Sequence, residues 1–314
     1  MLSLLGGVFL GWSLGANDAS NVFGSAVASR MLKFWTAAVL AAVFVLLGAL
    51  LQGQAGIETL KGLTRFTLEQ AVVSSVAAAS TVTIMTILGL PVSTSQAVVG
   101  AILGIGILNQ QLNLSGLGKV VACWFGTPVG AVVIAVIIYR LLAVFYNNLK
   151  INLIQSDILI RLSMIAAGSY GAYALGANNV ANVTAVFVGA GRLSVFSAAL
   201  IGGLSIGFGI LTLSKRVMET VGKKLVRLDP FSALVVLLAQ SITVHIYTFI
   251  GVPVSTSQAV IGAVLGVGIV KGISTVSGHT LVNIIIAWLL TPAIAGFFAI
   301  ALDFTIHLQY VPNP

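Results

Sequence analysis

Two short polar motifs, each present twice in an otherwise apolar chain, carry the residues best suited to chemistry. The hexapeptide PVSTSQ occupies 91–96 and again 253–258, and the related heptapeptides GANDASN and GANNVAN occupy 15–21 and 176–182. Hydroxyls, amides and the one carboxylate, Asp18, interrupt long apolar stretches here. Polar groups in such surroundings are costly unless they bind something, so the motifs predict sites for ions or polar solutes.

Each hexapeptide predicts half of an anion site. A proline allows the helix to break, and only about thirteen mostly apolar residues, 97–109, follow the first copy. At about 1.5 Å per residue they are too short to cross an apolar core of about 30 Å. We therefore expect a half-helix whose free N–H groups and positive dipole end lie near the membrane centre. Two such ends would hold one tetrahedral oxyanion.

The heptapeptides predict a cation site. Asp18 is the only carboxylate in the repeated motifs, and its counterpart in the second half is the neutral Asn179. A carboxylate, amide oxygens and backbone carbonyls freed where a helix unwinds would together suit a cation, so we expect both helices to break at these motifs. The candidate ligands are Asn17, Asp18, Asn21, Asn178, Asn179 and Asn182.

Neither motif contains lysine or arginine. Two helix ends, at about +0.5 charge each, cannot neutralise a dianion, and Asp18 offsets them further. The missing positive charge should therefore arrive with the substrate. This predicts cation-coupled symport.

Composition places the chain in a membrane. Hydrophobic residues are 58% and charged residues 7% of the 314 positions, far from the balance of soluble domains. The basic residues lie mostly between apolar segments, so the net charge of +8 reports orientation and not nucleic-acid binding. No nucleophile has a base at usable spacing, so we expect no enzyme and no resident cofactor.

The chain is an internal duplication. The paired heptapeptides, hexapeptides and Thr-Pro pairs begin at 15 and 176, 91 and 253, and 127 and 291, which are offsets of 161, 162 and 164 residues. Each half crosses the membrane three times if the hexapeptide arms re-enter and five times if they span, and either odd number inverts the second half. We predict an all-α polytopic membrane protein of two inverted-topology repeats, 1–148 and 149–314, with broken or re-entrant helices meeting at the midplane.

Loop charge predicts the orientation. The connection 215–229 carries a net charge of +3, whereas its counterpart 55–70 carries none. Because positive loops stay inside, equivalent loops face opposite sides and both termini should lie outside the plasma membrane.

The paired motifs, together with KRVMETVGKKLVRLDP at 215–230, resemble the inorganic phosphate transporter (PiT) family. The resemblance spans both halves and implies sodium- or proton-coupled symport of inorganic phosphate by an inverted-repeat protein that often forms a homodimer. Carried over by motif, the phosphate contacts would be Ser93, Thr94, Ser95, Gln96, Ser255, Thr256, Ser257 and Gln258, with Asp18 beside them.

This chain departs from the family at one position of each hexapeptide. Many relatives read PVSTTH, so Gln96 and Gln258 replace a titratable histidine, which favours sodium over protons. A proton-coupled phosphate or sulfate permease remains an alternative, and an anion channel is the alternative of another class. His245, in an apolar segment, is either a satisfied polar side chain or a proton carrier.

Overall fold

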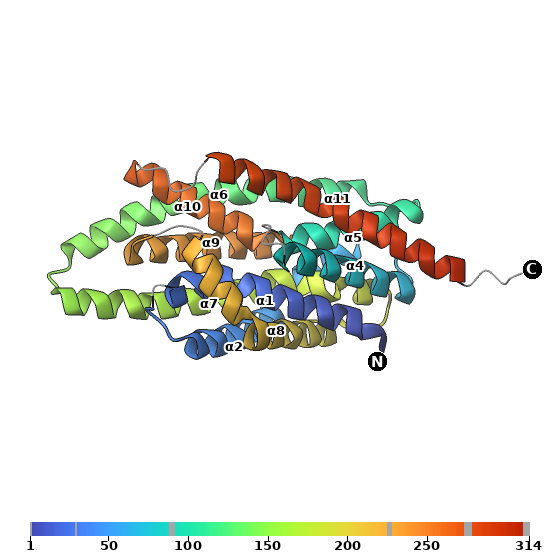
Figure 1. Cartoon of the computed structure of the whole chain (residues 1–314), viewed down its shortest axis with the longest axis horizontal. Coiled ribbons are helices and arrows are strands. Elements are labelled where there is room, and N and C mark those ends of the chain that lie inside the picture. The colour runs from blue at the N-terminus through green and yellow to red at the C-terminus, as the bar shows by residue number, and fades with distance from the viewer. Residues whose placement is uncertain (1, 29, 88–91, 225–227, 273–277, 310–314) are drawn as a thin grey trace, which may run out of the picture.

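The computed structural model describes residues 2–28, 30–87, 92–224, 228–272 and 278–309, all organised by helices (Figure 1). Apolar helices follow from the membrane, where every backbone polar group must be bonded within its own segment. The helices are α1 (Leu5–Ala28), α2 (Phe34–Gln52), α3 (Gln54–Lys61), α4 (Leu68–Ile87), α5 (Thr94–Leu108), α6 (Leu114–Asn148), α7 (Leu153–Gly189), α8 (Val195–Lys224), α9 (Pro230–Ile250), α10 (Thr256–Lys271) and α11 (Gly278–Gln309), after a 3₁₀ turn at Leu2–Leu4.

Among the described residues, seven helices are long and apolar enough to cross a bilayer: α2, α4, α6, α7, α9 and the apolar parts of α8 and α11. The 24 residues of α1 also have a spanning length, but the heptapeptide makes α1 more polar. The chain is therefore a multi-pass membrane protein.

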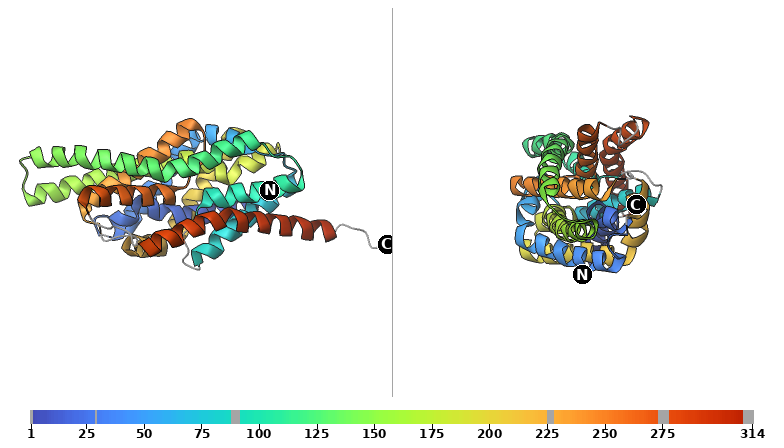
Figure 2. Two further views of the ribbon diagram at one scale, coloured as in Figure 1. Left: turned by 90° about the horizontal axis from the view of Figure 1, so that it is seen from above. Right: turned by 90° about the vertical axis from the view of Figure 1, so that its left-hand side faces the viewer.

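Equivalent helices of the two halves run in opposite directions. In Figure 1, α6 runs from right to left and α11 from left to right, and the same reversal relates α1 to α7. The start of α1 and the end of α11 consequently lie at one end of the molecule, which we call the termini end. The turn between α6 and α7 projects from the opposite end, the connection end (Figure 2). The predicted all-α fold of two inverted repeats is confirmed.

The arms of each hexapeptide re-enter. We call residues 68–108 hairpin 1 and residues 230–271 hairpin 2. At the base of hairpin 1, the side chains of Gln70 and Asn109 bond to each other at 2.8 and 3.1 Å. At the base of hairpin 2, Lys271 Nζ lies 2.6 Å from Asp229 Oδ2. Each second arm thus returns to the side where its first arm began.

The two halves interleave, because helices of one half pack on helices of the other. α1 lies on α8, α2 on α7, α5 on α11 and α6 on α10. At the crossing of α2 and α7, Gly48 faces the carbonyl of Tyr173 and Gly176 faces the carbonyl of Val45. A Cβ at either glycine would collide with that backbone, so small residues let the helices approach closely.

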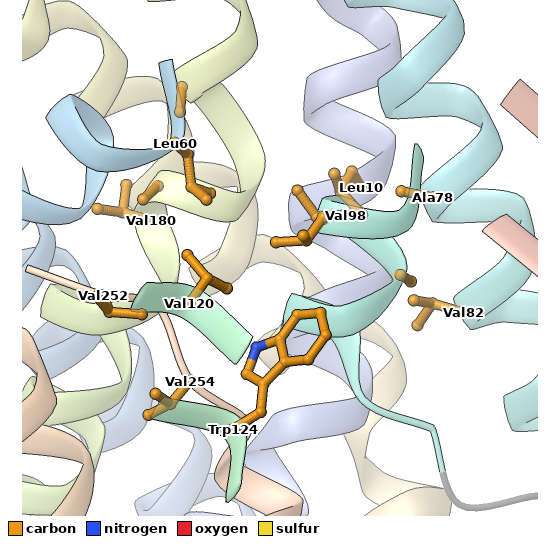
Figure 3. Close-up of a cluster of buried hydrophobic side chains, with 14 of the residues drawn as sticks. Leu10, Leu60, Ala78, Val82, Val98, Val120, Trp124, Val180, Val252 and Val254 are labelled. Carbon is orange, nitrogen blue, oxygen red and sulfur yellow. The ribbon is translucent and has the colours of Figure 1, made fainter. Parts of the chain in front are cut away.

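A large apolar core joins the hairpins to the surrounding helices. Figure 3 shows Trp124 of α6 beside Val98 of α5 and Val254 of the second hexapeptide, all in one buried cluster. This core brings segments from both hairpins against α6.

One expectation was wrong. α1 and α7 do not unwind at GANDASN and GANNVAN, but run as continuous helices through both motifs. The polar side chains project sideways and bond to neighbouring elements, so the backbone carbonyls stay in the helix. The chain breaks at the hexapeptides instead.

Candidate functional site

The two hexapeptides meet inside the molecule. Ser95 Oγ donates to the carbonyl of Val254 at 2.9 Å, and Ser257 Oγ donates to the carbonyl of Val92 at 3.4 Å. These are equivalent contacts, since both partners are offset by 162 residues. The pseudo-two-fold axis therefore passes between the hexapeptides, and the N-termini of α5 and α10 face a common centre.

The first serine of each hexapeptide has a structural role as well. Ser93 and Ser255 are the N-caps of α5 and α10, and their hydroxyls accept from the backbone N–H of Gln96 and Gln258 at 3.4 and 3.2 Å. Such caps stabilise helix ends. They fix where each half-helix begins. Pro253 precedes the second cap, while Pro91 lies outside the described residues.

Each heptapeptide reaches across to the hexapeptide of the other half. Asn21 Nδ2 donates to Thr256 Oγ1 at 3.1 Å, and the hydroxyl of Thr256 also bonds to the carboxylate of Asp18. From the second half, Asn182 Nδ2 donates to Ser95 Oγ at 3.0 Å. Both motifs of both halves thus form one polar centre.

Several buried polar atoms of this centre have no hydrogen-bond partner within the part of the chain that the structure describes. They are Thr94 Oγ1, Gln96 Oε1, Asn179 Nδ2, Asn182 Oδ1 and Gln258 Oε1. All five residues are at most 4% exposed. Leaving a buried polar atom unpaired costs about 1–3 kcal/mol, so five in one place indicate a site built for a ligand.

Two predicted cation ligands have other contacts. Asn17 Nδ2 donates to Thr86 Oγ1 at 3.4 Å, and Asn178 Nδ2 donates to Thr248 Oγ1 at 3.3 Å. Both asparagines therefore attach a heptapeptide helix to the first arm of the hairpin in its own half. The sequence analysis missed these threonines, although each stands five residues before the proline of its hexapeptide.

The pseudo-symmetric halves of the centre differ in exposure. Asn17, Asn21 and Ser257 are partly exposed, whereas their equivalents are sealed. Asn178, Asn182 and Ser95 are each only 1% exposed. The centre is therefore closed on one side of the axis and accessible on the other.

Other polar side chains lie outside this centre. His245 Nδ1 forms a hydrogen bond with Tyr170 Oη at 2.8 Å. Its other ring nitrogen, Nε2, lies 2.6 Å from Gln52 Oε1. Both ring nitrogens are thus bonded, as expected for a satisfied polar side chain. The indole N–H groups of Trp124 and Trp288, equivalents that precede the two Thr-Pro pairs, are buried without a partner in the described chain.

Two inverted repeats, paired re-entrant hairpins and a buried centre of hydroxyls and amides define a membrane transporter. Comparison with known proteins gives the family. A sequence profile of the phosphate transporter family matches residues 14–156 and again 149–299. The chain belongs to this family, whose members are transporters and not enzymes.

Individual relatives cover nearly the whole chain. A protein named a phosphate permease from Methanocaldococcus jannaschii is 30% identical over 94% of this chain and 93% of its own. The sulfate permease CysP of Bacillus subtilis is 28% identical over 93% of this chain and 84% of its own. A solved structure titled the sodium-dependent phosphate transporter is similar with a TM-score of 0.85 and 26% identity, covering 98% of both chains.

Proposed function

We propose that this protein is a sodium-coupled importer of inorganic phosphate that works by alternating access. The observation that carries the proposal is the cluster of unpartnered buried polar atoms at the junction of the two hexapeptides. The proposal keeps the repeat boundary at 148/149 and includes a homodimer in the plasma membrane with both termini outside.

The anion would bind between the N-termini of α5 and α10. The first N–H groups of a helix have no acceptor in the preceding turn, and both helix dipoles direct their positive ends to this point. Hydroxyls of the hexapeptides add donors, and the contacts are Ser93, Thr94, Ser95, Gln96, Ser255, Thr256, Ser257 and Gln258. Helix ends of this kind bind oxyanions.

Two acceptors favour phosphate over sulfate. Gln96 Oε1 and Gln258 Oε1 are buried and unpartnered, and a carbonyl oxygen beside an anion is repelled unless the anion donates a hydrogen. Dihydrogen phosphate can donate one hydrogen to each oxygen and hydrogen phosphate can donate to one of them, whereas sulfate has no proton to give. CysP is named a sulfate permease, so the family accommodates both anions and the choice rests on local residues.

The cation would bind near Asp18. Its carboxylate is the negative charge of the centre, and Asn182 Oδ1 is an unpartnered oxygen of the type that sodium accepts. Asn21 completes the proposed ligands, whereas the oxygen of Asn179 already accepts a hydrogen bond from Asn182 Nδ2 at 2.7 Å. No histidine described in the structure contacts these residues, which supports sodium above a proton as the coupling ion.

Alternating access is supported by the unequal exposure of equivalent residues. An inverted repeat can adopt two conformations in which the halves exchange roles, so the sealed and accessible sides would swap. A channel would instead need an open polar path through the molecule. The centre is sealed on one side.

Uptake of labelled phosphate into proteoliposomes, with sodium and proton gradients imposed separately, tests the proposal. A sodium gradient should drive accumulation, and a proton gradient alone should not. Excess sulfate should compete weakly. Equal uptake with and without any cation gradient would refute symport, and full competition by sulfate would reassign the substrate.

A further inference from the structure

Asn178 is bonded unlike the other asparagines of the two heptapeptides. Its Nδ2 donates to Thr248 Oγ1 at 3.3 Å and to the carbonyl of Val252 at 3.1 Å, while its Oδ1 accepts from the N–H of Val254 at 2.8 Å. Both ends of one amide are therefore occupied by hairpin 2. The oxygen that a cation would need already accepts a backbone hydrogen bond.

These bonds hold the tip of hairpin 2, residues 251–255, in a closed position. The tip begins with Gly251 in the left-handed region (φ 76°), and Val252 and Val254 are fully buried. A tip made of extended backbone has free N–H and C=O groups, which must be paired when buried. Asn178 pairs two of them in a manner that resembles a neighbouring strand.

Further contacts press the tip against the termini end of the molecule. Lys119 Nζ of α6 donates to the carbonyl of Ile250 at 2.8 Å. Gly56 of α3 faces the ring of Pro253, and Ala55 faces Gly251. The tip thus closes the centre on the side where Asn178, Asn182 and Ser95 are sealed.

The equivalent asparagine, Asn17, can be compared at two of these three contacts, because Leu90, the equivalent of Val252, lies outside the described residues. Asn17 is partly exposed and bonds Thr86 at 3.4 Å. Val92, the equivalent of Val254, forms no hydrogen bond with Asn17 in the described chain. The bond to the backbone of Val254 is therefore a property of the closed side and not of every heptapeptide.

We propose that Asn178 is a positioning residue that locks hairpin 2 shut, assisted by Thr248, and is not a ligand of the transported cation. Opening of the site on this side requires release of the three hydrogen bonds. The inference rests on the proposed alternating access, in which this side must open once in each cycle. It withdraws Asn178 from the predicted cation ligands.

Cysteine accessibility tests the lock. In a Cys123→Ser background, Val252→Cys would report opening through its reaction with a membrane-impermeant maleimide in proteoliposomes. Asn178→Ala, which removes three hydrogen bonds, should raise the labelling rate at least about tenfold, and Thr248→Val, which removes one of them, about fivefold, because one lost hydrogen bond costs about 1 kcal/mol. Thr243→Val is the matched control, since Thr243 and Thr248 both bond the carbonyl four residues back and only Thr248 contacts Asn178.

The outcomes separate the lock from the transport function. Unchanged labelling in Asn178→Ala and Thr248→Val, or an equal rise in Thr243→Val, would overturn the proposal. The proposal would also be overturned if Thr248→Val raised the sodium concentration needed for half-maximal uptake and left the labelling rate unchanged. Labelling requires no phosphate. The proposal on Asn178 can therefore be refuted while the parent protein still takes up phosphate, and it can be supported even if the parent protein does not.

Discussion

Asp18 is the residue on which the proposed coupling depends. It is 4% exposed, lies in the middle of a continuous membrane helix and bonds the hydroxyl of Thr256 in the opposite half. A carboxylate at this depth is costly, by roughly 3 kcal/mol, unless a positive charge accompanies it. The travelling cation would supply that charge.

Asp18→Asn should abolish sodium-dependent phosphate uptake and leave the protein folded. The amide has nearly the same shape and can still bond Thr256, but it lacks the charge that attracts a cation. Uptake in proteoliposomes measures the loss, and gel filtration with thermal unfolding in detergent checks the fold. Sodium coupling retained in this variant would contradict the assigned role.

Gln96→Ala and Gln258→Ala should each weaken phosphate affinity. Each change removes a buried, unpartnered carbonyl that would accept a hydrogen bond from the anion, and one lost bond of this kind costs about 1 kcal/mol, or roughly fivefold in affinity. The concentration dependence of uptake measures it. Gln54→Ala, at an exposed position of α3, is the control, and unchanged affinity in both site variants would remove the glutamines from the site.

The helices act as paired elements, each hairpin helix packed on a long helix of the other half. Gly262 of α10 faces the carbonyl of Pro128 in α6, and Gly100 of α5 faces that of Pro292 in α11. Proline lacks the N–H that would bond the preceding turn, while Thr127 and Thr291 bond the carbonyls of Cys123 and Ala287 at 2.7 and 2.6 Å. These bonds stabilise the long helices where the hairpins contact them.

Gly262→Ala should destabilise the protein, because its Cβ would collide with the backbone of Pro128. Overpacking of this kind costs about 1–3 kcal/mol. Thermal unfolding in detergent measures the change. Gly118→Ala is the matched control, since a Cβ there meets open space and the helix gains from alanine. Equal melting temperatures for the two variants would contradict the packing argument.

The contribution that the base of hairpin 2 makes to the stability of the fold should decrease in acid. Burial alone would raise the pKa of Asp229, but hydrogen bonds from Lys271 and Ser232 lower the pKa of Asp229 to about 2. A carboxyl with a lowered pKa stabilises the folded state above its unfolded pKa of about 3.9 and loses that contribution as the pH falls toward about 2. We expect Asp229→Asn to remove this part of the pH dependence of thermal unfolding.

Asp157→Asn provides the comparison for the ion pair between Asp229 and Lys271, which we call the clasp. Asp157 forms an exposed ion pair with Arg161 at 3.4 Å, one helical turn away, and such pairs contribute little. Its removal should leave the acid response of the wild type intact. If Asp229→Asn behaves in the same way, the clasp does not stabilise the hairpin.

At the scale of the whole molecule, the interleaved halves place the proposed cation and anion sites in one centre. Asp18 and Asn21 of the first half meet Thr256 of the second, and Asn182 of the second meets Ser95 of the first. A ligand bound to either motif therefore contacts elements of both halves. Such contacts would couple the two proposed sites.

Sodium should raise phosphate affinity, and phosphate should raise sodium affinity by the same factor, because coupling free energies are reciprocal. Equilibrium binding of labelled phosphate to the purified protein, at several sodium concentrations, measures one direction. Sodium-dependent protection from thermal unfolding, with and without phosphate, measures the other. A phosphate affinity that does not change with sodium concentration would show that the two ligands do not share this centre.

The sequence by itself determined the class of the fold and the family. Composition required membrane helices, the duplicated motifs required a repeat, and an odd number of crossings required its inversion, because these follow from chain length and bilayer thickness alone. The polar motifs also located the centre, since polar side chains are too costly in an apolar chain to lack a purpose.

Only the tertiary structure decided which motif contacts which. The sequence indicated unwinding at the heptapeptides, but hydroxyls and backbone from other elements pair their amides, so the helices continue. Repetition shows that two residues are equivalent and not that they touch. The contact between Asn21 and Thr256 arises from packing across the halves, and that between Asn178 and Val254 from packing within the second half. The same packing separates Asn178, bonded to a hairpin tip, from Asn182, whose oxygen remains unpaired.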